Sequence, residues 1–282
     1  MHVSQEYGLP HDYLTGVKQT ILLLLALSIA CVKQGPIDPG NDPVFTIVAN
    51  NDNTYRGFNR KIVVYGIPVY AVKGVEDVNL LHTAHVLAQY LDNNADSVVD
   101  NPLVLAAMIN QSAAMVLWTN QFQINGPGAQ DLGNNEIHPG FVTGGLQGPF
   151  DATLEEVFHL ISHAGYAYAY PSAFNESSSE LCLAMDVARG GHFTSIPSNY
   201  PSDAWYTYDD VTCDYGCMAT EYCYWALTSM LGAQAHRLDD IQHEWTLNTL
   251  AKVQQGDSAV YQLLSNSQYH LPTVLPDGNY QP

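Results

Sequence analysis

A short segment of the chain combines carboxylates and imidazoles at helical spacing. It reads Asp151-Ala-Thr-Leu-Glu-Glu-Val-Phe-His-Leu-Ile-Ser-His163. On a helix, one face carries the apolar residues Leu154, Val157, Phe158 and Ile161, and the opposite face carries Glu155, Glu156, His159 and His163. Two imidazoles at i, i+4 can bind one metal ion, with carboxylates one turn away. The segment therefore predicts a metal site held by His159 and His163.

The same segment also fits a surface helix that binds no metal. Thr153-Leu-Glu-Glu156 matches a capping box, and Asp151 is a further capping residue. Both glutamates suit the positive end of a helix dipole. On this interpretation the histidines are ordinary surface residues. We prefer the metal interpretation because a solvated helix face more often carries Lys and Glu.

The pair His159-x-x-x-His163 resembles the zinc helix of zincin metallopeptidases. In that family the motif is His-Glu-x-x-His, and its Glu is the general base. This chain has Leu160 at the position of that Glu. The resemblance therefore implies a zinc ion, with Glu156 or Glu155 as the base one turn earlier.

A catalytic zinc needs a third protein ligand. Zincins of the gluzincin type take it from a Glu on a later helix, and Glu221 is our candidate. It is the one acid in the apolar and aromatic segment 218–225, and such a carboxylate is rarely buried without a partner. Asp186 and His192 are weaker candidates. Tyr206 and Tyr208, in the preceding loop, are expected to stabilise an oxyanion.

Other histidines have simpler interpretations. His243-Glu244 begins like the zincin motif, but Leu247 replaces the second His, so we expect an exposed helix turn. His85 lies on the apolar line of its expected helix and is expected to be buried and hydrogen-bonded. With His82 it completes a metal site only if that helix packs beside His159.

Iron is the weakest metal alternative. Glu156-x-x-His159 matches one element of the di-iron carboxylate bundles, which need a second copy and two further glutamates. Only Asp240-Ile-Gln-His243 comes close.

The loop Asp92-Asn-Asn-Ala-Asp-Ser-Val-Val-Asp100 lies between two expected helices and resembles the calcium loop of an EF-hand or dockerin. Oxygen side chains stand at its positions 1, 3, 5 and 9, namely Asp92, Asn94, Asp96 and Asp100. Ser97 replaces the glycine of the sharp turn, and Leu103 stands where a bidentate acid is expected. The loop therefore predicts a weak calcium site or one completed from elsewhere. The alternative is a polar, Asx-rich turn.

Composition narrows the classes of partner. The chain has 282 residues, of which 46% are hydrophobic, and carries a formal net charge of −19 with only 9 Lys and Arg. Such a surface repels nucleic acids and anionic membranes and attracts cations. With 18 tyrosines and 13% charged residues, the chain is expected to fold and not to form an acidic disordered tail.

The N-terminal part predicts secretion. The apolar run over residues 21–32 has the length of a signal peptide and is too short to span a bilayer comfortably. We expect a signal peptide at 1–30, a linker at 31–43 and a single metal-binding, catalytic domain at 44–282. Cleavage before Cys31 gives a secreted protein that does not contact the membrane. The segment 27–31 faintly resembles a lipobox, so lipid anchoring at Cys31 is an alternative.

Four cysteines remain after Cys31, and in a secreted chain they favour two disulfides with three possible pairings. They are Cys182, Cys213, Cys217 and Cys223. The less favoured alternative is that Cys213 and Cys217 are zinc ligands. Cys217 and Cys223 are expected to face differently on one helix and to have different partners.

Periodicity predicts a mainly α fold of the α+β class, with a small N-terminal sheet. The zincin resemblance implies a zincin-like architecture. Strands are expected at 44–49 and 61–72, broken at Gly66-Ile-Pro68. Long loops are expected at 123–150 and 192–212. Helices are expected at 75–91, 102–118, 151–164, 177–189, 216–237, 239–254 and 258–265.

These features favour a secreted zinc-dependent hydrolase with a structural calcium site. It is expected to act on peptides or other small extracellular substrates, with Zn2+ and Ca2+ as its ions. The first alternative is a non-enzymatic extracellular calcium-binding protein, and the second is a metalloenzyme that is not a hydrolase.

Overall fold

A five-stranded sheet forms the N-terminal part of the protein, in the order β1-β2-β3-β4-β5. The computed structural model describes residues 42–123 and 128–282, which belong to one compact unit. The expected signal peptide, Cys31 and most of the expected linker lie outside the described residues. No helix in the described ranges is long and apolar enough to cross a membrane.

Two of the strands form a hairpin that alternating apolar residues hold against the core. β2 (Arg60–Val64) pairs antiparallel with β3 (Ile67–Ala71), and the short β1 (Val48–Ala49) pairs with β2. The turn between β2 and β3 uses Tyr65 and Gly66 at positive φ, +50° and +91°, as a two-residue hairpin turn requires. β4 (Met115–Trp118) and β5 (Gln130–Gly133) continue the sheet in parallel, so β5 lies at its edge.

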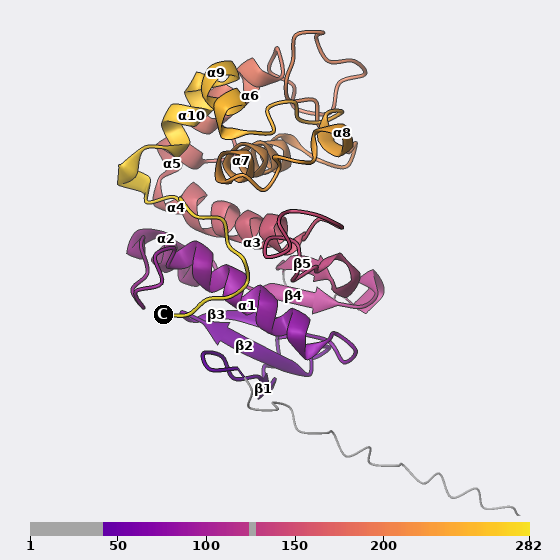
Figure 1. The fold of residues 1–282 in the computed structure, drawn as a ribbon, viewed down its shortest axis with the longest axis vertical. Coiled ribbons are helices and arrows are strands. Elements are labelled where there is room, and N and C mark those ends of the chain that lie inside the picture. The colour runs from indigo at the N-terminus through magenta and orange to yellow at the C-terminus, as the bar shows by residue number, and fades with distance from the viewer. Residues whose placement is uncertain (1–41, 124–127) are drawn as a thin grey trace, which may run out of the picture. The chain divides into compact units, whose positions relative to one another are not determined.

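Helices cover the sheet and build a second layer beyond it. α1 (Asp77–Leu91) and α2 (Pro102–Asn110) connect β3 to β4. α3 (Thr153–Ile161) continues through a π-helical turn (Ser162–Tyr166) into α4 (Ala167–Ala169) and α5 (Pro171–Phe174). The remaining helices are α6 (Glu180–Ala188), α7 (Tyr215–Leu231), α8 (Leu238–Ile241), α9 (Leu250–Gly256) and α10 (Ser258–Leu264). α3 lies between the sheet and α7, and α6, α9 and α10 lie beyond α7 (Figure 1).

The α+β class is confirmed, with helices predominating over a small sheet. The expected helix at 75–91 is confirmed as α1, and the helices at 177–189, 216–237 and 258–265 are present in shortened form. The helix expected at 102–118 is wrong in its second half, because α2 ends at Asn110 and Met115–Trp118 forms β4. Likewise, the expected loop at 123–150 contains β5.

The helix expected at 239–254 is also wrong. α8 ends at Ile241, and the chain then bends so that the fully buried Trp245 pairs with Tyr206 in an isolated β-bridge. Tertiary packing of the Trp245 side chain overrides the helical periodicity here. A new helix, α9, begins at Leu250 with Thr249 as its cap.

Candidate metal centre

Helix α3 has two buried faces. Its apolar residues Leu154, Val157, Phe158 and Ile161 are at most 2% exposed. The opposite face carries Glu155, Glu156 and His159; His159 faces Glu221 of α7, whereas Glu156 contacts β5 at the sheet edge. His159 is 5% exposed, so the alternative of an ordinary surface histidine is wrong for this residue.

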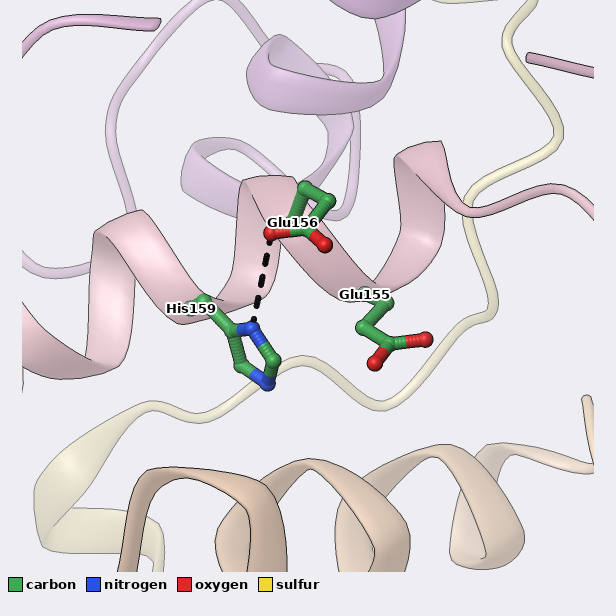
Figure 2. A group of neighbouring side chains, drawn as sticks. All are labelled: Glu155, Glu156 and His159. Atoms are coloured by element: carbon green, nitrogen blue, oxygen red, sulfur yellow. Dashed lines mark ion pairs between the residues drawn. The ribbon is translucent and has the colours of Figure 1, made fainter. Parts of the chain in front are cut away.

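His159 lies between two carboxylates from different helices. Its Nδ1 atom is 3.6 Å from Oε2 of Glu156, and its Nε2 atom is 3.5 Å from Oε2 of Glu221 on α7. Glu155, Glu156 and His159 each offer a ligand atom, and these atoms lie within 4.8 Å of one another. Glu155 and His159 extend from α3 to the same side, and Glu156 flanks the ring (Figure 2). One imidazole is therefore surrounded by three carboxylates.

The neighbouring groups shift the pKa values of Glu155 and His159. Burial, and next the charge of Glu221, raise the pKa of Glu155 to about 8, although the nearby His159 works against this shift. The pKa of His159 is raised well above its usual value: burial alone would lower it, but Glu221, Glu156 and Glu155 outweigh that effect. No Lys or Arg of the described chain forms an ion pair with any of the three glutamates.

The edge of the sheet holds Glu156 in place. Gln130, the first residue of β5, donates a hydrogen bond from Nε2 to Oε2 of Glu156. The Glu156 side chain is 26% exposed, against 11% for Glu221, so Glu156 is the more accessible carboxylate.

Glu221 receives its one hydrogen bond from the loop before α7. The Tyr208 hydroxyl donates to Oε1 of Glu221 over 3.3 Å. Burial first, and then Glu221, raise the pKa of Tyr208, so its hydroxyl stays protonated and remains a donor. Tyr206, expected beside Tyr208, is fully buried and donates to the Met218 carbonyl. The Tyr206 hydroxyl therefore has a structural role.

Two polar atoms of this group have no partner among the described residues. They are His159 Nε2 and Glu221 Oε2, both buried, 3.5 Å apart and without a hydrogen bond. Native structures rarely leave such atoms unsatisfied, and an unseen ion is one of the regular reasons. Imidazole and carboxylate are ligands that zinc accepts together. The donor set therefore fits a divalent cation.

His163 does not join this group. It lies in the π-helical turn, and its Nδ1 atom is 2.9 Å from Glu176, with 60% of the side chain exposed. A Cβ atom on Gly165 of this turn would come within 2.7 Å of Val104, so α2 packs closely against it. The expectation that His159 and His163 face one site assumed a regular α-helix, which ends at Ile161.

The other histidines pair with carboxylates outside the centre. His82 Nε2 lies 2.6 Å from Asp151, and His85 Nε2 lies 2.7 Å from Asp42. The expectation of a buried, hydrogen-bonded His85 is confirmed. His192 pairs with Asp186 at 2.8 Å, so these two candidate third ligands bind each other.

His243 and Glu244 do not lie in the helix turn that the sequence predicts, because α8 ends at Ile241. They form a group with Asp209, in which one ligand atom of each residue lies within 4.8 Å of the others.

The expected calcium loop is a network of hydrogen bonds. Asp92 is fully buried and accepts from the backbone N–H groups of Asp96 and Ser97. The hydroxyls of Tyr65 and Tyr280 also donate to Asp92, so the C-terminal segment closes over it. Asn94 and Asp96 hydrogen-bond to each other, and Asp100 accepts from the backbone of Asn93. Asp92, Asp96 and Asp100 are not among the groups of acidic, His or Cys side chains that lie close enough together to hold a metal in the described residues.

The cysteines form one disulfide among the described residues, between Cys213 and Cys217. Cys182 and Cys223 are free and buried, so the expectation of a second disulfide is wrong in this structure. Cys217 and Cys223 do have different surroundings, as expected from their spacing.

Two features of the centre were missed in the sequence. No feature of the sequence indicates that Gln130 contacts Glu156, because this contact depends on the position of β5. Glu155 as a metal ligand, in place of the base that the sequence predicts, does have a signal, since Glu155 and His159 stand at i, i+4 with Glu156 directly after the first. Comparison of the chain with family models, curated proteins and solved structures finds no match.

Proposed function

We propose that this chain is a zinc-dependent hydrolase of peptides, in which Glu155, His159 and Glu221 hold the metal. The observation that carries the proposal is a pair of buried atoms that make no hydrogen bond, His159 Nε2 and Glu221 Oε2, 3.5 Å apart. Each such atom costs about 1–3 kcal/mol when it is left unsatisfied. A divalent cation would satisfy both and offset the charge of three neighbouring carboxylates.

The order of residues on α3 supports this ligand set. Glu155-Glu156-x-x-His159 matches the zincin motif with Glu in place of the first His, so Glu156 occupies the position of the general base. Glu221 on a later helix corresponds to the third ligand of the gluzincin type. The zincin resemblance therefore supports a metal site at Glu155 and His159, one helical turn before the pair His159 and His163.

Glu155, His159 and Glu221 would hold the zinc, which when bound would supply Lewis acidity to polarise a substrate carbonyl and lower the pKa of water. Glu156 is the proposed general base, because it is partly exposed and held by Gln130 beside His159. The Tyr208 hydroxyl has one proton, which it donates to Glu221, so Tyr208 is proposed to orient this ligand; the oxyanion role expected for Tyr208 would require that proton to leave Glu221.

The proposal includes an extracellular location and a weak calcium site. The apolar run at 21–32 supports secretion. Asn94 and Asp96 support calcium binding because both side chains are solvent-accessible. Asp92 contributes less, since its oxygens already accept four hydrogen bonds.

Metal analysis of the purified protein, followed by peptide hydrolysis before and after zinc removal, tests this function. We expect one zinc per chain and hydrolysis that depends on it. Glu156→Gln should keep the zinc and lose hydrolysis, whereas His159→Ala should lose both. Calcium alone would favour the binding protein, and iron or copper would favour an enzyme that is not a hydrolase.

A further inference from the structure

Arg189, at the C-terminal end of α6, is buried without a carboxylate partner. Its side chain has no exposed surface, and no ion pair of the described chain includes it. A buried guanidinium carries a desolvation cost of several kcal/mol. An apolar side chain would avoid this cost, so the N–H donors of the guanidinium must have a role that an apolar side chain cannot fill.

These donors organise the loop that follows α6. Arg189 Nη1 donates to the Phe193 carbonyl over 2.8 Å, and Nη2 donates to the Tyr200 hydroxyl over 3.4 Å. The guanidinium also lies 5.3 Å and 5.6 Å from the centres of the Phe193 and Tyr200 rings, at cation–π distance. One side chain therefore holds two separate points of this loop.

The backbone folds back over Arg189 because of the glycine that follows it. Gly190 has φ +74°, and a Cβ atom there would lie 2.7 Å from Pro201. The returning chain is fixed again where the N–H groups of Trp205 and Tyr206 donate to the Ala188 carbonyl. The loop thus closes around the guanidinium and brings Tyr200 beside Tyr208.

A chain of hydrogen bonds then leads to the metal centre. The Tyr200 hydroxyl accepts from Arg189 and donates to the Tyr208 carbonyl over 2.6 Å. The Tyr208 hydroxyl donates to Glu221 over 3.3 Å. We propose that Arg189 is a positioning residue, which acts through Tyr200 to fix the backbone of Tyr208 and so hold the Tyr208 hydroxyl on Glu221. The effect of Arg189 on zinc binding rests on the proposed function. The effect of Arg189 on the position of Tyr208 does not.

Amide hydrogen exchange of the zinc-free protein tests the first part. We expect Arg189→Met and Tyr200→Phe to accelerate exchange around residues 204–210 by about tenfold or more, as loss of a local anchor does. The exposed Arg56→Met is the matched control and should change nothing there. Tyr200→Phe keeps the ring and removes only the hydroxyl, so it remains informative if Arg189→Met does not fold. Unchanged exchange in both variants would overturn the proposal.

Zinc affinity, measured by competition with a chromogenic chelator, tests the second part as a double-mutant cycle. Tyr208→Phe should weaken zinc binding by about tenfold, the usual effect of losing a partner of a metal ligand. Tyr200→Phe should weaken it too, but should add nothing in the Tyr208→Phe background. Additive effects would overturn the route through Tyr208. If the wild type binds no zinc, the proposed function fails, and the exchange experiment alone decides whether Arg189 holds Tyr208.

Discussion

His159 of α3 faces Glu221 of α7 with its Nε2 atom 3.5 Å from a carboxylate oxygen, and neither atom has another partner in the described chain. These two helices belong to different layers, one against the sheet and one beyond it (Figure 1). The contact therefore joins the layers through ionisable groups at a place where apolar packing would be cheaper. Such a costly contact is expected where function requires it.

The first prediction concerns the identity of the metal ligands. Glu155→Gln keeps the shape of the side chain and removes its charge, so zinc affinity should fall by at least about tenfold. Glu155→His recreates the complete His-Glu-x-x-His motif and should retain zinc. Equilibrium dialysis with zinc analysis measures both.

His163→Ala is the control for this prediction, because the His163 ring is exposed and bound to Glu176. It should bind zinc like the wild type. Loss of zinc in His163→Ala together with full binding in Glu155→Gln would instead favour the pair His159 and His163.

The second prediction concerns calcium. Millimolar calcium should raise the melting temperature, because an ion that binds only the folded state stabilises it. Asp96→Ala should abolish this shift with little effect on the calcium-free protein, since Asp96 is exposed. Asp92→Ala should lower the melting temperature even without calcium, because Asp92 anchors Tyr65 and Tyr280. An unchanged wild-type melting temperature would leave the loop as an Asx-rich turn.

The sequence predicts the Glu/His face of α3, the involvement of Glu221 and the α+β class, because each depends on local periodicity or on the cost of burying a charge. The sequence does not predict where helix α3 ends. In the π-helical turn at Ser162–Tyr166, Gly165 packs closely against α2, a contact distant in sequence. That turn decides that His163 pairs with Glu176.

β4 illustrates a second limit. Met115–Trp118 is a short apolar run, which fits a strand and a buried helix equally well. The pairing with β3 and β5 decides between them, and β5 itself begins with polar residues that give little strand signal. Gln130 therefore reaches Glu156 only through tertiary structure.

The third prediction is a loss of stability in acid that depends on Asp151. Burial alone would raise the pKa of Asp151, but the hydrogen bond and charge of His82 and the His138 N–H hold this pKa below its usual value. A carboxyl with a lowered pKa in the folded state contributes stability above its unfolded pKa of about 3.9. This contribution is lost as the pH falls through the folded-state pKa.

Asp151→Asn should therefore destabilise the protein by about 1.5–3 kcal/mol near neutral pH, the usual range for a hydrogen bond to a charged group. The difference from wild type should shrink below about pH 4. Urea unfolding between acidic and neutral pH measures it, with the exposed Asp239→Asn as control. A difference that stays constant with pH would show that Asp151 acts through its shape alone.

The last prediction concerns the cysteines, for which sequence and structure disagree. Burial raises the pKa of the Cys223 thiol to about 12, so it stays protonated, and Cys182 is buried as well. An alkylating reagent should therefore leave both unlabelled in the native, unreduced protein. After denaturation without reduction it should label Cys182 and Cys223, whereas Cys213 and Cys217 should react only after reduction. Peptide mapping by mass spectrometry identifies the labelled residues. If denaturation exposes no thiol at Cys182 or Cys223, the mature protein has the second disulfide that the sequence predicts, and these two helices are joined covalently.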